Sequence, residues 1–199
     1  GPILMQQHFY LVGGTTIAIY LGHRHSVDLD WFTGEGFPDT MLLAQNIRDK
    51  GIPFTTGQIE RGTLHGTISG VRVSFLEYKY PLIKPLINWQ ESACQLASLE
   101  DLASMKLSAL IQRGSKKDFV DIYALGLRHF RLRDMLRFYQ QKYSVEDMGH
   151  VLYGLSYFDD ADKERLPKMF WDVDWKIVKK TIRGWVKEVA GHRPFPLNG

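Results

Sequence analysis

The sequence predicts an α+β fold in which short strands come first and helices follow. Before about residue 90 the apolar residues alternate in short runs broken by glycine, a pattern typical of strands. After residue 90 the apolar residues recur at intervals of three and four, which is typical of amphipathic helices. We therefore expect a small mixed-sheet domain over residues 1–90 and a helical domain over residues 91–199.

Turn residues divide the first region into strands and two helices. Ser69-Gly70 lies between two alternating runs and predicts a hairpin, and Arg61-Gly62 predicts the turn before it. Asp39 can cap a helix whose end is favoured by Gly51. The expected strands are residues 8–12, 27–32, 53–60, 62–69 and 71–78, and the expected helices are residues 15–22 and 39–50.

Capping patterns and apolar spacing place the helices of the second region. Ser98 and Ser115 are each followed three residues later by an aspartate, which is typical of a helix start. Further helices are expected over residues 131–142, 144–155 and 174–190. The last has an apolar stripe at intervals of three and four, made of Trp175, Val178, Ile182, Trp185 and Val189.

The composition is that of a folded protein and excludes several classes. Hydrophobic residues make up 44% of the 199 and charged residues 24%, which excludes wholesale disorder. No apolar run approaches the ~18 residues that a membrane-spanning helix needs. The single cysteine, Cys94, excludes an intrachain disulfide and a cysteine-based zinc site. Since no signal segment opens the chain, we expect a cytoplasmic protein.

Positive charge is concentrated in one stretch of the second region. Residues 113–142 hold eight basic and three acidic residues, although the whole chain has a net charge of only +3. Such a surplus suits a phosphate-bearing partner, whereas a solvated helix face is the alternative. The RNA-binding residues that this surplus predicts are Arg113, Lys116, Lys117, Arg131, Arg133 and Arg137.

A glycine pair and two aspartates carry the strongest chemical signal. Val12-Gly13-Gly14-Thr15 takes a strand directly into a helix, so backbone N–H groups and the helix dipole can approach a phosphate. Asp28 and Asp30 follow in a strand, where a period of two puts both carboxylates on one face. Two adjacent carboxylates favour a hard cation such as Mg²⁺ or Mn²⁺ between them.

An Asp-x-Asp sequence alone is weak evidence, and a second copy shows why. Asp172-Val173-Asp174 stands just before the expected last helix, where one of the two aspartates is expected to be an N-cap. Asp28 and Asp30 differ because they interrupt an otherwise apolar strand, which is a costly position for a carboxylate without a ligand.

The strand, glycine pair, helix and Asp-x-Asp resemble the nucleotidyltransferase fold of the DNA polymerase beta superfamily. Two longer blocks, LVGGTTIAIYLGHRHSVDLDWF (11–32) and LEDLASMKLSALIQRGSKKDFVDIYAL (99–125), narrow the resemblance. Together they resemble the AbiEii/AbiGii-type nucleotidyltransferase toxins of abortive-infection toxin–antitoxin systems. The resemblance implies a nucleotidyltransferase domain followed by a helical domain that completes the active-site cleft.

The resemblance also implies roles for individual residues. The helical lysine Lys106 would neutralise phosphate charge and act in catalysis, while Asp118 or Asp121 would orient or deprotonate the acceptor hydroxyl. Asp28 and Asp30 would be catalytic and bind Mg²⁺ or Mn²⁺. The residues that would bind the nucleotide are Gly13, Gly14, Thr15, Arg24, Ser26 and Lys106.

Structural alternatives stand beside the roles of the two helical aspartates. Lys106 and Arg113 are seven residues apart, so they share one helix face. Asp118 could be the carboxylate of a capping box, and Asp121 could form a buried salt bridge to Lys106 or Arg113. Either alternative is compatible with a role in the reaction.

One position departs from the superfamily pattern. Many members carry a third carboxylate on a later strand, and Ser74 stands where that acid would be. Glu77 is the nearest acid, but in an unbroken strand it points to the opposite face, and only a bulge would bring it round. The substitution weakens the expectation of a second metal.

The sequence therefore predicts a metal-dependent enzyme that transfers NMP from an NTP to an acceptor hydroxyl, as the toxin of a toxin–antitoxin system. RNA, and tRNA in particular, is the expected acceptor, and an antitoxin protein is a possible partner. A catalytically degenerate module that binds a nucleotide or a partner protein is the alternative, and Ser74 is its main support.

Overall fold

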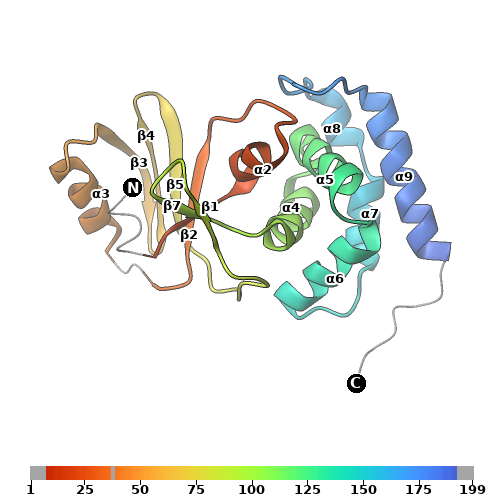
Figure 1. Ribbon diagram of the computed structural model, residues 1–199, viewed down its shortest axis with the longest axis horizontal. Helices are drawn as coiled ribbons and strands as arrows, with labels where there is room; N and C mark the ends of the chain where they lie inside the picture. The colour runs from red at the N-terminus through yellow and green to blue at the C-terminus, as the bar shows by residue number, and fades with distance from the viewer. Residues whose placement is uncertain (1–7, 37–38, 192–199) are drawn as a thin grey trace. The chain divides into compact units, whose positions relative to one another are not determined.

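A mixed sheet of seven strands forms within the described residues, which are 8–36 and 39–191 of the computed structural model (Figure 1). The strands lie in the order β3-β4-β5-β2-β1-β7-β6. The β1–β7 and β2–β5 pairs are parallel, and the other neighbouring pairs are antiparallel. Their bounds are β1 Tyr10–Val12, β2 Leu29–Thr33, β3 Phe54–Glu60, β4 Thr63–Ile68, β5 Val71–Glu77, β6 Ile87–Trp89 and β7 Cys94–Leu96.

All five expected strands are present, and β6 and β7 are additional. The two extra strands have three residues each, too few for an alternating pattern to be recognised in the sequence. They pair with each other, and β7 pairs with β1, so the sheet continues past residue 90. The chain divides into two compact units after Leu102, a sheet unit (Gly1–Leu102) and a helical unit (Ala103–Gly199).

Alternation along the strands gives the sheet one apolar face, which α3 (Thr40–Asp49) covers (Figure 1). Trp31, Val73 and Phe75 come from neighbouring strands and pack with Leu43 and Ile47 of that helix. Residues one position away along the strands must face the other side. Asp30 and Ser74 are two such residues, so the polar residues of the expected site share the face opposite this core.

Helix ends in the structure test the capping predictions. Asp39 accepts a hydrogen bond from the Leu42 N–H at 2.8 Å, and Asp174 accepts one from the Lys176 N–H at 2.7 Å, which confirms both caps. Ser98 also caps its helix, accepting from the Asp101 N–H at 3.1 Å. Besides α3, the helices are α2 Gly13–Leu21, α4 Leu99–Arg113, α5 Lys116–Arg128, α6 Leu132–Tyr143, α7 Gly149–Ser156, α8 Asp159–Lys163 and α9 Trp175–Gly191.

Ser115 does not form the expected capping box. Its hydroxyl bonds Glu164 at 2.9 Å, and the same carboxylate accepts the N–H of Lys116, the first residue of α5, at 2.8 Å. The start of α5 is therefore capped by a residue 48 positions further along the chain. No local pattern could have revealed this cap.

Two other expectations in the helical unit need correction. The helix expected over residues 144–155 begins only at Gly149, because Ser144 adopts a left-handed conformation with φ of 53° and ends α6. The short helix α8 was not expected, since four of its five residues are charged and it shows no apolar period. No described helix is both long enough and apolar enough to cross a lipid bilayer.

A glycine permits a close contact between α5 and α9 within the helical unit. A Cβ added at Gly126 of α5 would lie 2.2 Å from Cη2 of Trp185 in α9, too close for any side chain. Tyr123 stacks on the same indole with ring centroids 6.2 Å apart. The packing of α5 on α9 therefore depends on the absence of a side chain at this position.

Replacing Gly126 with alanine should destabilise the protein by about 1–3 kcal/mol, because the added methyl group overpacks the contact with Trp185. Chemical denaturation measures the loss as a lower free energy of unfolding. Gly184→Ala is the matched control, since its methyl group would meet no atom within 4 Å. That variant should gain up to about 1 kcal/mol from helix propensity. Equal effects of the two changes would contradict the packing argument.

Candidate functional site

The turn between β1 and α2 brings the backbone close to a carboxylate. Val12, the last residue of β1, lies opposite Asp30 of β2, and Gly13 begins α2 with a φ of +76°. A Cβ at Gly13 would lie 2.5 Å from Oδ2 of Asp30, so only glycine fits here. Val12 stands at the N-cap of α2 but has no side-chain oxygen to accept a hydrogen bond. The first backbone N–H groups of α2 therefore need acceptors from outside the helix.

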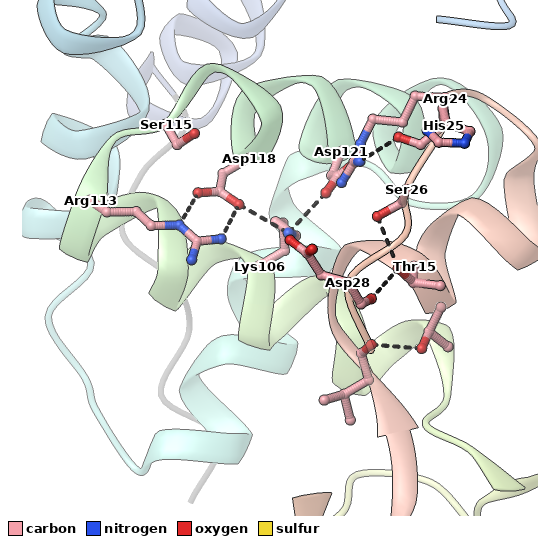
Figure 2. Close-up of polar contacts among 12 residues, drawn as sticks. Thr15, Arg24, His25, Ser26, Asp28, Lys106, Arg113, Ser115, Asp118 and Asp121 are labelled. Atoms are coloured by element: carbon pink, nitrogen blue, oxygen red, sulfur yellow. Dashed lines mark hydrogen bonds and ion pairs between the residues drawn. The ribbon is translucent and has the colours of Figure 1, made fainter. Parts of the chain in front are cut away.

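Thr15 ties the first turn of α2 to the segment that leads into β2 (Figure 2). Its hydroxyl lies 2.9 Å from that of Ser26 and also bonds the carbonyl of Asp28. Because the Thr15 hydroxyl already bonds protein atoms, its backbone N–H is the better group for a phosphate. Arg24 is buried and donates to the carbonyl of His25 at 3.1 Å, so its guanidinium is not presented at an open surface.

Asp28 forms a two-pronged ion pair with Arg72 of β5. The guanidinium Nε and a terminal nitrogen lie 3.1 and 2.8 Å from the two carboxylate oxygens. Arg72 and Ser74 alternate onto one face of β5, and Ser74 lies opposite Asp30. Asp28 and Asp30 therefore share that face, as the strand period predicts. Arg72 was not singled out in the sequence, since its partner is 44 residues away.

Ser74 occupies the register position of a third carboxylate, and a histidine stands beside it. His65 of β4 pairs with Ser74, and its Nδ1 lies 3.0 Å from the Ser74 hydroxyl. The pairing of β5 with β2 and β4 has no irregularity, so no bulge turns Glu77 toward this face. Glu77 instead lies 3.3 Å from the Lys79 ammonium. The bulge alternative for Glu77 is therefore wrong.

A second set of expected residues forms a buried ion cluster in the helical unit (Figure 2). The Lys106 ammonium of α4 lies 3.0 Å from Asp118 and 2.8 Å from Asp121, which both belong to α5. Arg113 adds two hydrogen bonds to Asp118, at 2.6 and 2.8 Å. The salt bridge expected for Asp121 is confirmed, whereas Asp118 binds these cations instead of completing a capping box.

The cluster shifts the pKa values of its members. Burial alone would lower the pKa of Lys106, but the charges of Asp121 and Asp118 outweigh it and raise the pKa above its usual value. Burial alone would raise the pKa of Asp118, but hydrogen bonds and charges from Arg113 and Lys106 outweigh it and lower the pKa. Both groups are therefore held in their charged forms.

The expected RNA-binding residues differ in their exposure. Arg131, Arg133 and Arg137 are exposed at the start of α6 and along it. Arg113 is half-exposed and bound to Asp118, and Lys117 is half-buried.

Lys116 is buried, in contrast to the exposed position expected for an RNA-binding residue. Its ammonium donates to the Glu164 carbonyl and lies 4.9 Å from the ring centroid of Trp175. These contacts hold Lys116 inside the helical unit.

Comparison with known proteins identifies the family. A family model described as the nucleotidyl transferase AbiEii toxin of a type IV toxin–antitoxin system matches residues 68–184. The chain belongs to this family. The matched range includes Lys106, Asp118 and Asp121, whereas Gly13 and the two strand aspartates precede it. The family resemblance seen in the sequence is thereby confirmed.

Three similar proteins match over most of the chain. An uncharacterised protein of Aquifex aeolicus (strain VF5) is 34% identical over 184 residues, which cover 90% of this chain and 87% of that protein. MenT4, a nucleotidyltransferase toxin from Mycobacterium tuberculosis H37Rv, superposes with a TM-score of 0.62 at 14% identity, covering 96% of this chain and 80% of its own. JHP933 from Helicobacter pylori gives a TM-score of 0.56 at 14% identity, over 95% and 86% of the two chains. The structural likenesses show the nucleotidyltransferase fold.

Removing the charge of Asp118 should change how stability depends on pH. Its lowered pKa means that the carboxylate stabilises the fold fully above the unfolded value of about 3.9 and less as the pH falls through the folded value. Asp118→Asn should cost about 3–5 kcal/mol near neutral pH, because two cations lose their buried partner. The gap to wild type should narrow below about pH 4.

Urea unfolding between pH 3 and pH 7 measures this gap. Asp159→Asn, which removes an exposed carboxylate of α8, is the control and should change stability by less than about 0.5 kcal/mol. A gap that stays constant over the whole pH range would contradict the role given to Asp118.

Proposed function

We propose that this AbiEii-family protein transfers NMP from an NTP to a hydroxyl of an RNA acceptor, using a divalent cation. The observation that carries the proposal is the placement of Asp28 and Asp30 on one sheet face, beside a strand-to-helix turn that only glycine can form. A phosphate-binding turn next to paired carboxylates is the arrangement that phosphoryl-group chemistry requires.

Two carboxylates suffice for Mg²⁺ or Mn²⁺ when the substrate supplies further oxygens. Mg²⁺ is usually bound by one or two carboxylates, several waters and the phosphates of the nucleotide. Within residues 8–36 and 39–191 no group of three or more His, Cys, Asp or Glu side chains could hold a metal, so the remaining ligands of the ion would have to be waters and nucleotide oxygens. The bound ion would neutralise charge on the transferring phosphate. To bind the ion, the Asp28 carboxylate must give up its salt bridge to Arg72.

The chain's own groups bind and orient the nucleotide. The backbone N–H groups of Gly13, Gly14 and Thr15 open α2 and, with the helix dipole, hold the triphosphate. Ser26 keeps the Thr15 side chain turned toward β2, which leaves the turn open to the ligand. Arg24 shapes this loop from its buried position, where it donates to the His25 carbonyl, and it stays a proposed nucleotide-binding residue.

Lys106, Asp118 and Asp121 serve the same reaction from the helical unit. Lys106 stays charged because its pKa is raised, so it can neutralise phosphate charge. Asp118 has a lowered pKa and two cationic partners, which make it a poor proton acceptor. Asp121 is therefore the residue proposed to orient or deprotonate the acceptor hydroxyl, and Asp118 positions the two cations.

The charge of the helical unit supports RNA, including tRNA, as the acceptor. Arg131, Arg133 and Arg137 are exposed near one another in the chain, and a free NTP would not need so wide a cationic surface. A second exposed stripe runs along one side of α9, where intervals of three and four place Lys176, Lys180, Arg183 and Lys187. Membership of the toxin family supports an antitoxin protein as a partner and a role in abortive infection as further parts of the proposal.

A binding module without transfer activity is the second possibility, and one contact favours it. Ser74 lies opposite Asp30 and bonds His65, so this position supplies a hydroxyl where a third carboxylate would bind metal. Calorimetry with an NTP in the presence and absence of Mg²⁺ separates the two. Mg²⁺-dependent binding without turnover on any acceptor would support the module.

Asp28→Asn and Asp30→Asn should each reduce nucleotidyl transfer at least 100-fold, because one carboxylate alone holds a divalent cation poorly. The measurement is transfer of label from each NTP to total RNA with Mg²⁺ or Mn²⁺. Asp172→Asn is the matched control, since it changes the first aspartate of the other Asp-x-Asp and lies exposed before α9. Undiminished transfer by either strand variant would refute the proposed metal site.

Reversing the charges of Arg131, Arg133 and Arg137 to glutamate should weaken RNA binding and leave NTP binding with Mg²⁺ unchanged. Each lost phosphate contact should also reduce the salt dependence of the affinity. The control reverses Lys50, Arg61 and Lys79, three exposed cations of the sheet unit, with the same change in net charge. Filter binding of RNA at several salt concentrations measures both effects. An RNA affinity that does not change with salt concentration would contradict the proposed RNA-binding surface. An affinity that is unchanged when the three arginines are reversed would contradict it as well.

A further inference from the structure

Tyr153 of α7 and Tyr157, the residue that follows the helix, present their rings to solvent side by side. Tyr153 is 71% exposed and Tyr157 is 39% exposed, and they are four residues apart in the chain. Their ring centroids are 6.1 Å apart and the ring planes differ by only 17°. These exposed rings could not be recognised in the sequence, because the helix expected over residues 144–155 does not reveal which side of α7 packs inward. A parallel exposed pair of this kind is a surface on which a further flat ring can stack.

The two rings border a groove of about 510 Å³ on the helical unit. The groove is also lined by Ile111 and by three glycines, Gly114, Gly149 and Gly154. A Cβ at Gly154 would lie 3.4 Å from Cγ1 of Ile111, so any side chain here would begin to fill the space. The volume lies in the range of sites for small organic groups.

Ionic groups at the rim of the groove have partners of opposite charge. Asp160 lies 2.9 Å from the Lys163 ammonium, and Arg113 is bound to Asp118. His150 contributes an exposed imidazole, whose Nε2 lies 3.5 Å from the Tyr139 hydroxyl. An aromatic wall with a balanced polar rim suits an uncharged planar heterocycle with polar edges, which describes a nucleobase.

Arg113 connects this groove with the buried ion cluster. It lines the groove, and its guanidinium holds Asp118, which in turn binds the ammonium of Lys106. A base in the groove would therefore lie beside the guanidinium that holds Asp118, in the same ion cluster as Asp121, the residue proposed to act on the acceptor. This continuity favours the acceptor RNA over the NTP as the source of the base.

We propose that the α7 groove stacks one unpaired nucleobase of the acceptor RNA against Tyr153 and Tyr157. The inference rests on the proposed function for the identity of the RNA as acceptor. Stacking tolerates any base, because every base has an aromatic face. The groove thus selects RNA with an unpaired end or loop over a continuous duplex.

The test compares two RNA hairpins without NTP or metal, one with a short single-stranded 3′ end and one blunt. Tyr153→Ala should weaken binding of the hairpin with the unpaired end about 10-fold, as expected for the loss of one stacked base. Tyr153→Phe keeps the ring and should remain within about twofold of wild type. A 2-aminopurine in the unpaired end should be quenched by wild type and by Tyr153→Phe, but not by Tyr153→Ala.

Phe170→Ala removes an equally prominent ring of the helical unit outside the groove and should bind both hairpins as wild type does. Tyr153→Ala should bind the blunt hairpin and an NTP with Mg²⁺ as wild type does. Unchanged affinity of Tyr153→Ala for the unpaired end would overturn the proposal and favour a protein partner for the groove. Parallel loss of NTP binding would overturn it in favour of the substrate nucleotide. These binding experiments do not require nucleotidyl transfer. A protein without transfer activity could therefore still pass or fail this test, so failure of the proposed function and failure of the proposed groove can be told apart.

Discussion

The salt bridges of the buried Lys106 ammonium fix how α4 and α5 pack together in the helical unit. Taking a lysine and two aspartates out of water is costly, and the cost is recovered only when their geometry is held closely. Here α4 supplies the cation and α5 both anions, so the two helices can slide past each other only by separating charges in a low-dielectric interior. Arg113 adds a second cation from the end of α4 and fixes the orientation of the Asp118 carboxylate. The same contacts that position these groups therefore also register the two helices.

Much of the fold could be predicted from the sequence because its signals are local. The strand alternation, the Asp39 cap and the glycine stop after α3 each act within a few residues. The common face of Asp28 and Asp30 follows from the strand period, whereas Ser74 was singled out by the superfamily pattern and its position opposite Asp30 comes from the structure. The additional strands β6 and β7 could not be predicted, because three residues are too few to show an alternating pattern. In the structure β7 pairs with β1, and β6 pairs with β7.

The features that could not be predicted involve partners far apart in the chain. Arg72 binds Asp28 across 44 residues, and the burial of Lys116 depends on Glu164 and Trp175. A run of basic residues reads as one surface in the sequence, whereas the structure directs Lys116 inward and Arg131 outward. Charge counting in the sequence therefore could not separate cations that hold the fold from cations that face solvent.

The cap that Glu164 provides for α5 makes the segment after α8 part of the site's framework. Its carboxylate holds the Ser115 hydroxyl and the first N–H of the helix that carries Asp118 and Asp121. A connecting loop usually tolerates changes in length, but here an insertion between α8 and Glu164 would withdraw the cap and fray the helix start. Further along the same segment, Trp171 lies with its ring centroid 4.9 Å from the guanidinium of Arg128, the last residue of α5. A change of length in this segment should therefore disturb α5 at its start when it displaces Glu164 and at its end when it displaces Trp171.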